Sequence, residues 1–182
     1  MVCKVARSGE EWGIVVNAAE WPGALTSGLM ELGRIVFANH FHHAMDAKNR
    51  IAIPAKYRDA LRDAGHPLEF YLRPPDMADA SLAADHLELM PRFVFEAFSV
   101  AERPQTFSLS EAEAKIRRRR FSLAVQVEAD AQGRIVIPER FMAANRDQEK
   151  IGPAILRKDL ILVGMGDRIE LWNEGDYEKS LV

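Results

Sequence analysis

The chain has 182 residues, of which 48% are hydrophobic and 28% charged, and its 24 Lys and Arg against 27 Asp and Glu give a formal net charge of −3. This composition excludes an intrinsically disordered chain, and no stretch approaches the roughly 20 apolar residues of a membrane-spanning helix. The first thirty residues lack the basic start and apolar run of a secretory signal, and the single Cys3 cannot form an internal disulfide. We therefore expect a cytoplasmic protein.

An internal repeat organises the chain. The segment 46–57 aligns with the segment 130–141 at a spacing of 84 residues, and six of the twelve positions are identical. Before the second copy, apolar and polar residues alternate over 121–129, which predicts a strand with one buried face. The segment 37–45 keeps a weaker form of this alternation, so each copy is expected to begin with such a strand.

A tight turn is predicted after the first strand of each copy. Asp46 and Asp130 can accept hydrogen bonds from backbone N–H groups, and Asn49 and Gly133 tolerate the positive φ of a reversal. The sequence Arg-Ile-x-Ile follows in both copies and predicts a second short strand with both isoleucines on one face. These residues define the two turns on which the functional prediction depends.

A helix is expected after each of these second strands. Pro54 and Pro138 are well placed as the first helical residue, where the missing N–H costs little. Tyr57 and Leu61 then form the buried stripe of the first helix, and Gly65 is expected to end it.

The unit continues with two more strands in each copy. They are predicted over 68–72 and 86–90 in the first copy, and over 160–163 and 168–172 in the second. The segment Gly164-Met-Gly-Asp167 is expected to be a hairpin turn, because it lacks the third glycine and the following helix of a nucleotide-binding loop.

The chain is accordingly divided into four parts. They are an N-terminal extension at 1–35, a first unit at 36–102 with a terminal helix over 92–102, a basic connector at 103–120 and a second unit at 121–182. Each unit has about 55 to 60 repeat residues, near the lower limit for one independent core. We therefore expect the two copies to intertwine, with a small barrel shared between them.

The repeated blocks resemble the MraZ family, bacterial transcriptional regulators built from tandem SpoVT/AbrB-type domains. The resemblance rests on the blocks 43–54, 127–138 and 162–172 and spans about residues 36–181. It implies an α+β, mainly β fold, in which swapped-hairpin units form a double-split β-barrel with short flanking helices. It also implies a homo-oligomeric ring that represses its own division and cell-wall gene cluster by binding short direct repeats in promoter DNA. The extension 1–35 has no counterpart in the pattern and is either a genuine arm or an over-extended reading of the gene.

The resemblance assigns the DNA-contacting role to Arg50 and Arg134. A guanidinium at the tip of a rigid turn can form two hydrogen bonds with guanine or clamp a phosphate. The plainer interpretation is that each arginine pairs with the aspartate four residues earlier, Asp46 or Asp130. We favour DNA contact because the arginine recurs in both copies.

Other basic residues are ranked below these two. Lys48 and Gln132 lie one step inside the turns and are expected to contact phosphate or base. The run 115–120 carries five charges in six residues, and a solvated helical or linker face is the favoured interpretation.

No metal, cofactor or small-molecule substrate is predicted. His40, His42 and His43 have only Asp46 nearby, whereas metal sites usually need about three or four ligands. No nucleophile elbow, phosphate-binding loop or thiol nucleophile suggests an enzyme. The expected partner is therefore double-stranded promoter DNA in the nucleoid. An AbrB-like antitoxin and a structural ring protein that does not bind DNA are the alternatives.

Overall fold

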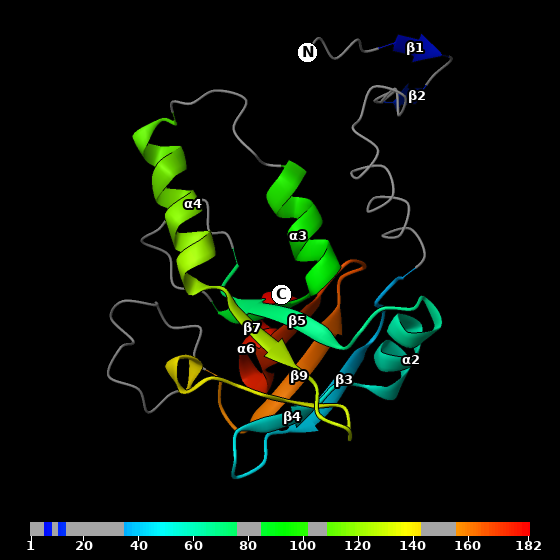
Figure 1. Ribbon diagram of the computed structural model, residues 1–182, viewed down its shortest axis with the longest axis vertical. Coiled ribbons are helices and arrows are strands. Elements are labelled where there is room, and N and C mark those ends of the chain that lie inside the picture. Colours follow the sequence, from blue (N-terminus) through cyan, green and yellow to red (C-terminus); the bar gives the residue numbers. More distant parts are fainter. Residues whose placement is uncertain (1–5, 9–10, 14–34, 76–84, 102–108, 143–155) are drawn as a thin grey trace.

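Most of the described strands form one six-stranded antiparallel sheet. The computed structural model describes residues 6–8, 11–13, 35–75, 85–101, 109–142 and 156–182 (Figure 1). The order of the large sheet is β3-β9-β10-β6-β5-β7. Its strands are β3 (His40–Ala44), β5 (Glu69–Arg73), β6 (His86–Pro91), β7 (Val125–Glu128), β9 (Asp159–Gly164) and β10 (Ile169–Asn173).

Two smaller sheets complete the described β-structure. The strands β4 (Arg50–Ala52) and β8 (Arg134–Val136) pair with each other, and this pair is called the β4–β8 ribbon below. The strands β1 (Ala6–Ser8) and β2 (Glu11–Gly13) form a separate hairpin near the N-terminus. The fold is thus mainly β, as predicted.

The two copies of the repeat exchange their first strands. Strand β3 of the first copy pairs with β9 of the second, with Phe41 opposite Leu162, and β7 of the second pairs with β5 of the first, with Val125 opposite Leu72. The predicted intertwining is confirmed by this pairing. The described strands leave the six-stranded sheet open and the ribbon separate, so no closed barrel is found among them.

A local two-fold axis relates the copies. Ile51 lies opposite Ile135 in the β4–β8 ribbon, and Glu88 lies opposite Glu170 where β6 pairs with β10. In each pair the two residues come from equivalent positions of the repeat. The axis therefore passes through the centre of the ribbon and between the two central strands of the sheet.

The main core fills the space enclosed by these exchanged strands. The two isoleucines of each Arg-Ile-x-Ile segment are almost completely buried, as the sequence predicts. Each large aliphatic side chain buried in this way stabilises the fold by about 1.5 to 3 kcal/mol relative to exposure. Tyr57 is buried among them and donates its hydroxyl hydrogen to the carbonyl oxygen of Asn39 at 2.8 Å.

The helix after the ribbon strand differs between the copies. Helix α2 (Ala55–Asp63) buries Tyr57 and Leu61, and Gly65 adopts the predicted positive φ of 78° after its end. Pro54 precedes this helix as its N-cap rather than starting it. In the second copy the helix described is one 3-10 turn, Glu139–Phe141, which again buries an aromatic ring.

The connector between the copies contains a helix that changes one prediction. Helix α4 (Glu111–Leu123) includes residues 121–123, which period-two alternation assigned to a strand. The reason is a capping box, in which the Ser110 hydroxyl accepts from the Glu113 N–H and the Glu113 carboxylate accepts from the Ser110 N–H. This cap starts a helix that runs through the basic segment, and the strand β7 begins only at Val125.

Two further helices follow the central strands. Helix α3 (Arg92–Ala101) follows β6, in agreement with the predicted helix, and α6 (Glu174–Ser180) follows β10. Figure 1 shows α3 and α4 at one end of the molecule and β4 at the other. None of the described helices is long and apolar enough to cross a membrane.

Candidate nucleic-acid interface

The first turn is held by the carboxylate of Asp46. Its Oδ1 accepts hydrogen bonds from the backbone N–H groups of Lys48 at 2.8 Å and Arg50 at 3.0 Å. Asn49 has a φ of 56°, as the turn prediction requires. The backbone N–H and the side chain of Arg50 lower the pKa of the Asp46 carboxyl, because both stabilise its charged form.

The second turn repeats this geometry with different side chains. Asp130 Oδ1 accepts from the backbone N–H groups of Gln132 and Arg134, each at 2.9 Å, and Gly133 has a φ of 76°. The Arg134 side chain and these backbone donors lower the pKa of Asp130 to about 2. Both aspartates therefore carry a negative charge at neutral pH.

Each turn arginine is bound to its aspartate. The Arg50 Nε donates to Asp46 Oδ2 at 2.7 Å, and the Arg134 Nε donates to Asp130 Oδ2 at 2.9 Å. The structure thus contains the ion pair between each arginine and the aspartate four residues earlier, which was the plainer interpretation of the sequence. The pair uses one edge of each planar guanidinium and leaves the N–H groups of the other edge to a further acceptor.

Both arginines extend from one exposed face of the β4–β8 ribbon. Arg50 lies opposite Val136, and Arg134 lies opposite Ala52, so all four share the face opposite the buried isoleucines. Arg50 and Arg134 are therefore diagonal neighbours in the ribbon, a relation that places Cα atoms about 7 to 8 Å apart. The Arg50 and Arg134 side chains are each 27% exposed, and Val136 is 54% exposed. The two guanidiniums therefore belong to one common surface.

The ribbon is fixed by reciprocal bonds between the copies. The Ile53 N–H donates to the Gly133 carbonyl at 2.9 Å, and the Ile137 N–H donates to the Asn49 carbonyl at 2.8 Å. Each turn is thus anchored to the strand end of the other copy. A loop held at both its own aspartate and the opposite strand pays little ordering entropy when it binds a ligand.

Arg58 is an additional basic residue that the sequence analysis missed. It comes from α2 of the first copy and lies against the second turn, where a Cβ on Gly133 would be 2.4 Å from Arg58 Cδ. Its Nε donates to the Ile53 carbonyl at 3.0 Å. At the equivalent position of the second copy the chain has Met142. The repeat spacing alone shows that Arg58 is matched by Met142. That Arg58 lies against the turn of the other copy could be inferred only from the pairing of the two copies.

The basic run 115–120 does not join this surface. It lies on α4, at the opposite end of the molecule from β4 (Figure 1). Two of its arginines make local contacts: Arg118 Nε donates to the Ala114 carbonyl at 3.2 Å, and the Arg117 guanidinium lies 5.0 Å from the centre of the Phe121 ring.

The three histidines of β3 lie on the strand that leads into the first turn. His40 and His42 are exposed on the same face, with ring centres 5.8 Å apart, and His42 Nδ1 is 3.0 Å from Glu174 Oε1. His43 faces the other way, and burial lowers its pKa. Within the described part of the chain, no group of three or more His, Cys, Asp or Glu could hold a metal ion.

Comparison with known proteins gives a consistent set of relatives. A protein-family model described as "MraZ protein, putative antitoxin-like" matches residues 121–181. A protein named transcriptional regulator MraZ from Mycoplasmopsis pulmonis is 33% identical over 140 residues, which covers 76% of this chain and 80% of the relative. Relatives of the same name from Thermomicrobium roseum and Geotalea daltonii are 32% and 29% identical, covering 84% and 87% of their own lengths and 78% and 79% of this chain.

Proposed function

Because the chain belongs to the MraZ family, we propose that it is a sequence-specific DNA-binding transcriptional regulator whose β4–β8 ribbon contacts the DNA. The observation that carries this proposal is the common outward face of Arg50 and Arg134, each held by an aspartate and anchored to the other copy. Relatives named transcriptional regulators support the same function.

The ribbon has the right size for the major groove of B-DNA, which admits a two-stranded β-ribbon. The free edge of each guanidinium can form two hydrogen bonds with the O6 and N7 acceptors of guanine. Ala52 and Val136 lie beside the arginines and can contact a thymine methyl group. In this proposal Lys48 and Gln132 at the turns contact phosphate or neighbouring bases, and Arg58 adds a cation beside the second turn.

A chain of net charge −3 needs many such contacts to hold DNA. A homo-oligomeric ring would present several ribbons, and each further ribbon would bind at a high effective concentration once the first is engaged. Short direct repeats upstream of the protein's own gene are the matching target. The proposal therefore includes a ring of double-split barrels built from exchanged hairpins, acting as a cytoplasmic repressor on the nucleoid.

The test compares Arg50→Ala and Arg134→Ala with the matched control Arg118→Ala, which removes a guanidinium from α4. The DNA is a duplex from upstream of the protein's own gene, with a scrambled duplex beside it. Each ribbon variant should lose about 1 to 3 kcal/mol of specific binding free energy, and the control should bind like the wild type. Thermal unfolding of all three variants checks that the fold is intact.

A second pair of variants separates base contacts from phosphate contacts. Arg50→Lys and Arg134→Lys keep the charge but lose the planar guanidinium. Loss of discrimination between the two duplexes with little loss of total affinity would support base recognition. Wild-type specific affinity in the alanine variants would contradict the proposal.

The antitoxin-like alternative is favoured by the description of the matching family. An antitoxin would also bind an operator, but its main activity would be to neutralise a toxin. A DNA affinity that stays negligible at every salt concentration would instead support a structural ring protein. A DNA-binding protein loses affinity steeply as the salt concentration rises.

A further inference from the structure

The outer face of the β4–β8 ribbon differs between the two sides of the local two-fold axis. At the repeat spacing of 84 residues, Arg50 corresponds to Arg134. At the same spacing Ala52 corresponds to Val136. Val136 lies opposite Arg50 in the ribbon, whereas Ala52 lies opposite Arg134. One arginine therefore has a valine as its cross-strand neighbour, and the other has an alanine.

Val136 presents the larger apolar side chain of this face. It is 54% exposed, whereas the equivalent Ala52 is half-buried and has only a methyl group. A valine side chain is branched at Cβ and restricted in χ1, so its two γ-methyl groups keep nearly fixed positions. The ribbon itself is anchored by the hydrogen bonds of the Ile53 and Ile137 N–H groups. A rigid apolar group is thus present on one side of the axis and missing on the other.

The two ends of the ribbon differ as well. The exposed turn residue is Lys48 in the first copy and Gln132 in the second. Arg58 lies against the second turn, whereas its counterpart Met142 lines a cavity together with Asn49 of the first turn. Contacts of the two cations with phosphate carry no sequence information. Gln132 and the apolar pair of the ribbon face are therefore the unequal residues that could distinguish bases.

The symmetry of a ribbon decides what kind of DNA site it reads. A two-fold symmetric protein reads a palindromic site, because the two halves of the site meet identical residues. Arg50 and Arg134, each bound to its aspartate, obey the local two-fold symmetry. Turning the ribbon by 180° in the groove exchanges these two arginines without loss of contacts. A preferred direction on the DNA requires residues that break the symmetry.

We propose, as an extension that rests on the proposed DNA contact, that Val136 sets the direction of the ribbon by contacting the 5-methyl group of a thymine. The major groove displays this methyl group, and apolar side chains recognise it. The thymine lies beside the base contacted by Arg50, because Arg50 is the cross-strand neighbour of Val136. At the symmetry-related position Ala52 lacks both γ-methyl groups, so the equivalent base is not read. Each ribbon therefore recognises an asymmetric site.

The experiment replaces the thymines of the upstream duplex one at a time by deoxyuridine, which lacks only the 5-methyl group. Fluorescence anisotropy measures the affinity of the full chain for each duplex. The proteins are wild type, Val136→Ala and the matched control Gln132→Ala, which alters the other unequal residue of the second copy. Both positions are exposed, so the truncations should leave the fold intact, and thermal unfolding checks this.

Wild type should lose affinity about three- to tenfold at a thymine on one side of the site centre, because one methyl contact is lost. Val136→Ala should bind the unmodified duplex with a loss of the same size and should show no further loss with deoxyuridine. Gln132→Ala should keep the full wild-type response to deoxyuridine, whatever its total affinity. This pattern would couple the thymine methyl group to Val136.

A gain-of-function variant gives an independent test. Ala52→Val places the same side chain on both sides of the axis. It should bind about threefold more tightly than wild type to a duplex in which the symmetry-related base is changed to thymine. Equal affinities of the two proteins for that duplex would contradict the role given to the γ-methyl groups.

Three results would overturn the proposal: no response to deoxyuridine in wild type, equal responses on both sides of the site, or an undiminished response in Val136→Ala. Failure of this inference alone is recognised by specific wild-type binding that Arg50→Ala and Arg134→Ala weaken. Failure of the proposed function appears instead as absence of specific binding by wild type, or as unchanged binding by these two arginine variants, and it overturns both proposals.

Discussion

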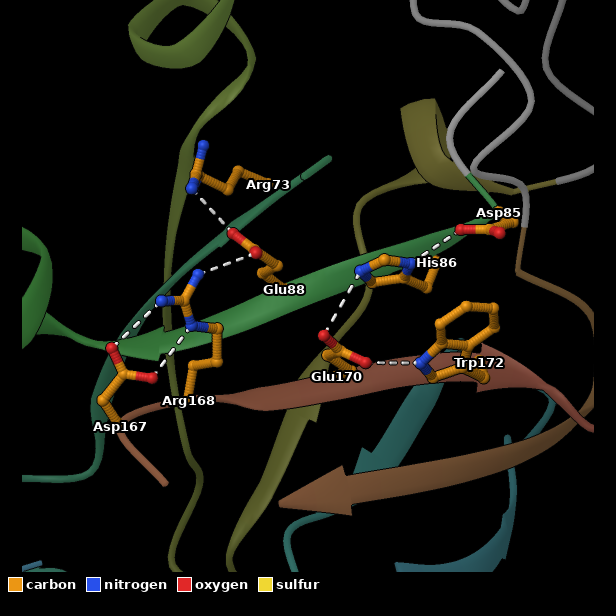
Figure 2. A network of polar contacts seen from close by, with 8 residues as sticks. All are labelled: Arg73, Asp85, His86, Glu88, Asp167, Arg168, Glu170 and Trp172. Carbon is orange, nitrogen blue, oxygen red and sulfur yellow. Dashed lines mark hydrogen bonds and ion pairs between the residues drawn. The ribbon is translucent and has the colours of Figure 1, made fainter. Parts of the chain in front are cut away.

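The two copies of the repeat share their turn geometry and strand pairing but differ in the side chains at equivalent positions. Near the local two-fold axis, His86 is the first residue of β6 and Arg168 directly precedes β10, and each approaches the glutamate of the other strand (Figure 2). Arg168 NH1 is 2.9 Å from Glu88 Oε1, and His86 Nε2 is 3.6 Å from Glu170 Oε1. The comparison shows that the repeated pattern sets the register, while individual side chains set how much each copy contributes to stability and binding.

The surroundings of the two glutamates extend this difference. Glu88 also contacts the buried Arg73, so its single carboxylate contacts two guanidiniums. Glu170 instead accepts a hydrogen bond from Trp172 Nε1 at 2.8 Å, and the indole ring stacks on His86. The surroundings of Glu88 are therefore a buried ion network, whereas those of Glu170 are a network of aromatic and hydrogen-bonding groups.

The largest expected effect comes from removing the charge of each glutamate in turn. Glu88→Gln leaves the buried Arg73 without its carboxylate and should lower the free energy of unfolding by about 3 kcal/mol or more. Glu170→Gln keeps an oxygen for the indole N–H and should cost about 1 kcal/mol. Urea unfolding at one fixed protein concentration measures both. Equal losses would show that the two halves are energetically equivalent.

The second prediction exchanges the residues of positive φ, Asn49 and Gly133, between the two turns and compares the change in stability. Gly133→Asn places a side chain where Arg58 lies and forces it to move away from its bond with the Ile53 carbonyl, so a loss of about 1 to 2 kcal/mol is expected. Asn49→Gly should change stability by less than about 0.5 kcal/mol, because relief of positive φ is offset by a more flexible unfolded chain. The measurement is again urea unfolding, and a larger effect at Asn49 would contradict the role given to Arg58.

The smallest effect concerns acid stability. The pKa of Asp130 is lowered to about 2 in the folded chain, below the ordinary value of 3.8. The stabilisation from this carboxylate is therefore fully present above about pH 4 and is lost as the pH falls towards 2. Asp130→Asn should flatten the pH dependence of unfolding over this range. Because the group is exposed, the change is expected to be small, and an unchanged pH profile would contradict the role of the turn ion pair.

Local features of the fold could be predicted from the sequence because they depend on neighbouring residues. The repeated Asp-x-x-(Asn or Gly)-Arg segment predicts both turns, and the structure confirms the positive φ of Asn49 and Gly133. The isoleucines after each turn were predicted to share a buried face, and they do. The strand predicted from Phe121 is wrong for residues 121–123, because the helix that starts at the Ser110 capping box continues to Leu123.

Contacts between distant segments could not be predicted in the same way. Arg58 lies against Gly133 only because the hairpins exchange, and the Arg73 and Glu88 pair joins two strands of the sheet. Nothing in the local pattern around these residues indicates their partners. The pairing of Arg50 with Asp46 was foreseen, but whether the same guanidinium also contacts DNA depends on a surface that forms only in the folded chain.

The most direct test of the proposed interface places a photo-crosslinking amino acid at Val136, which lies opposite Arg50 and two residues after Arg134 on the outer face of the β4–β8 ribbon. The control position is Ile116, which is 44% exposed on α4 at the other end of the molecule. The probe at position 136 is expected to form covalent adducts with the upstream duplex, whereas the probe at position 116 is not. Adducts from position 116 alone, with none from position 136, would contradict the proposed interface.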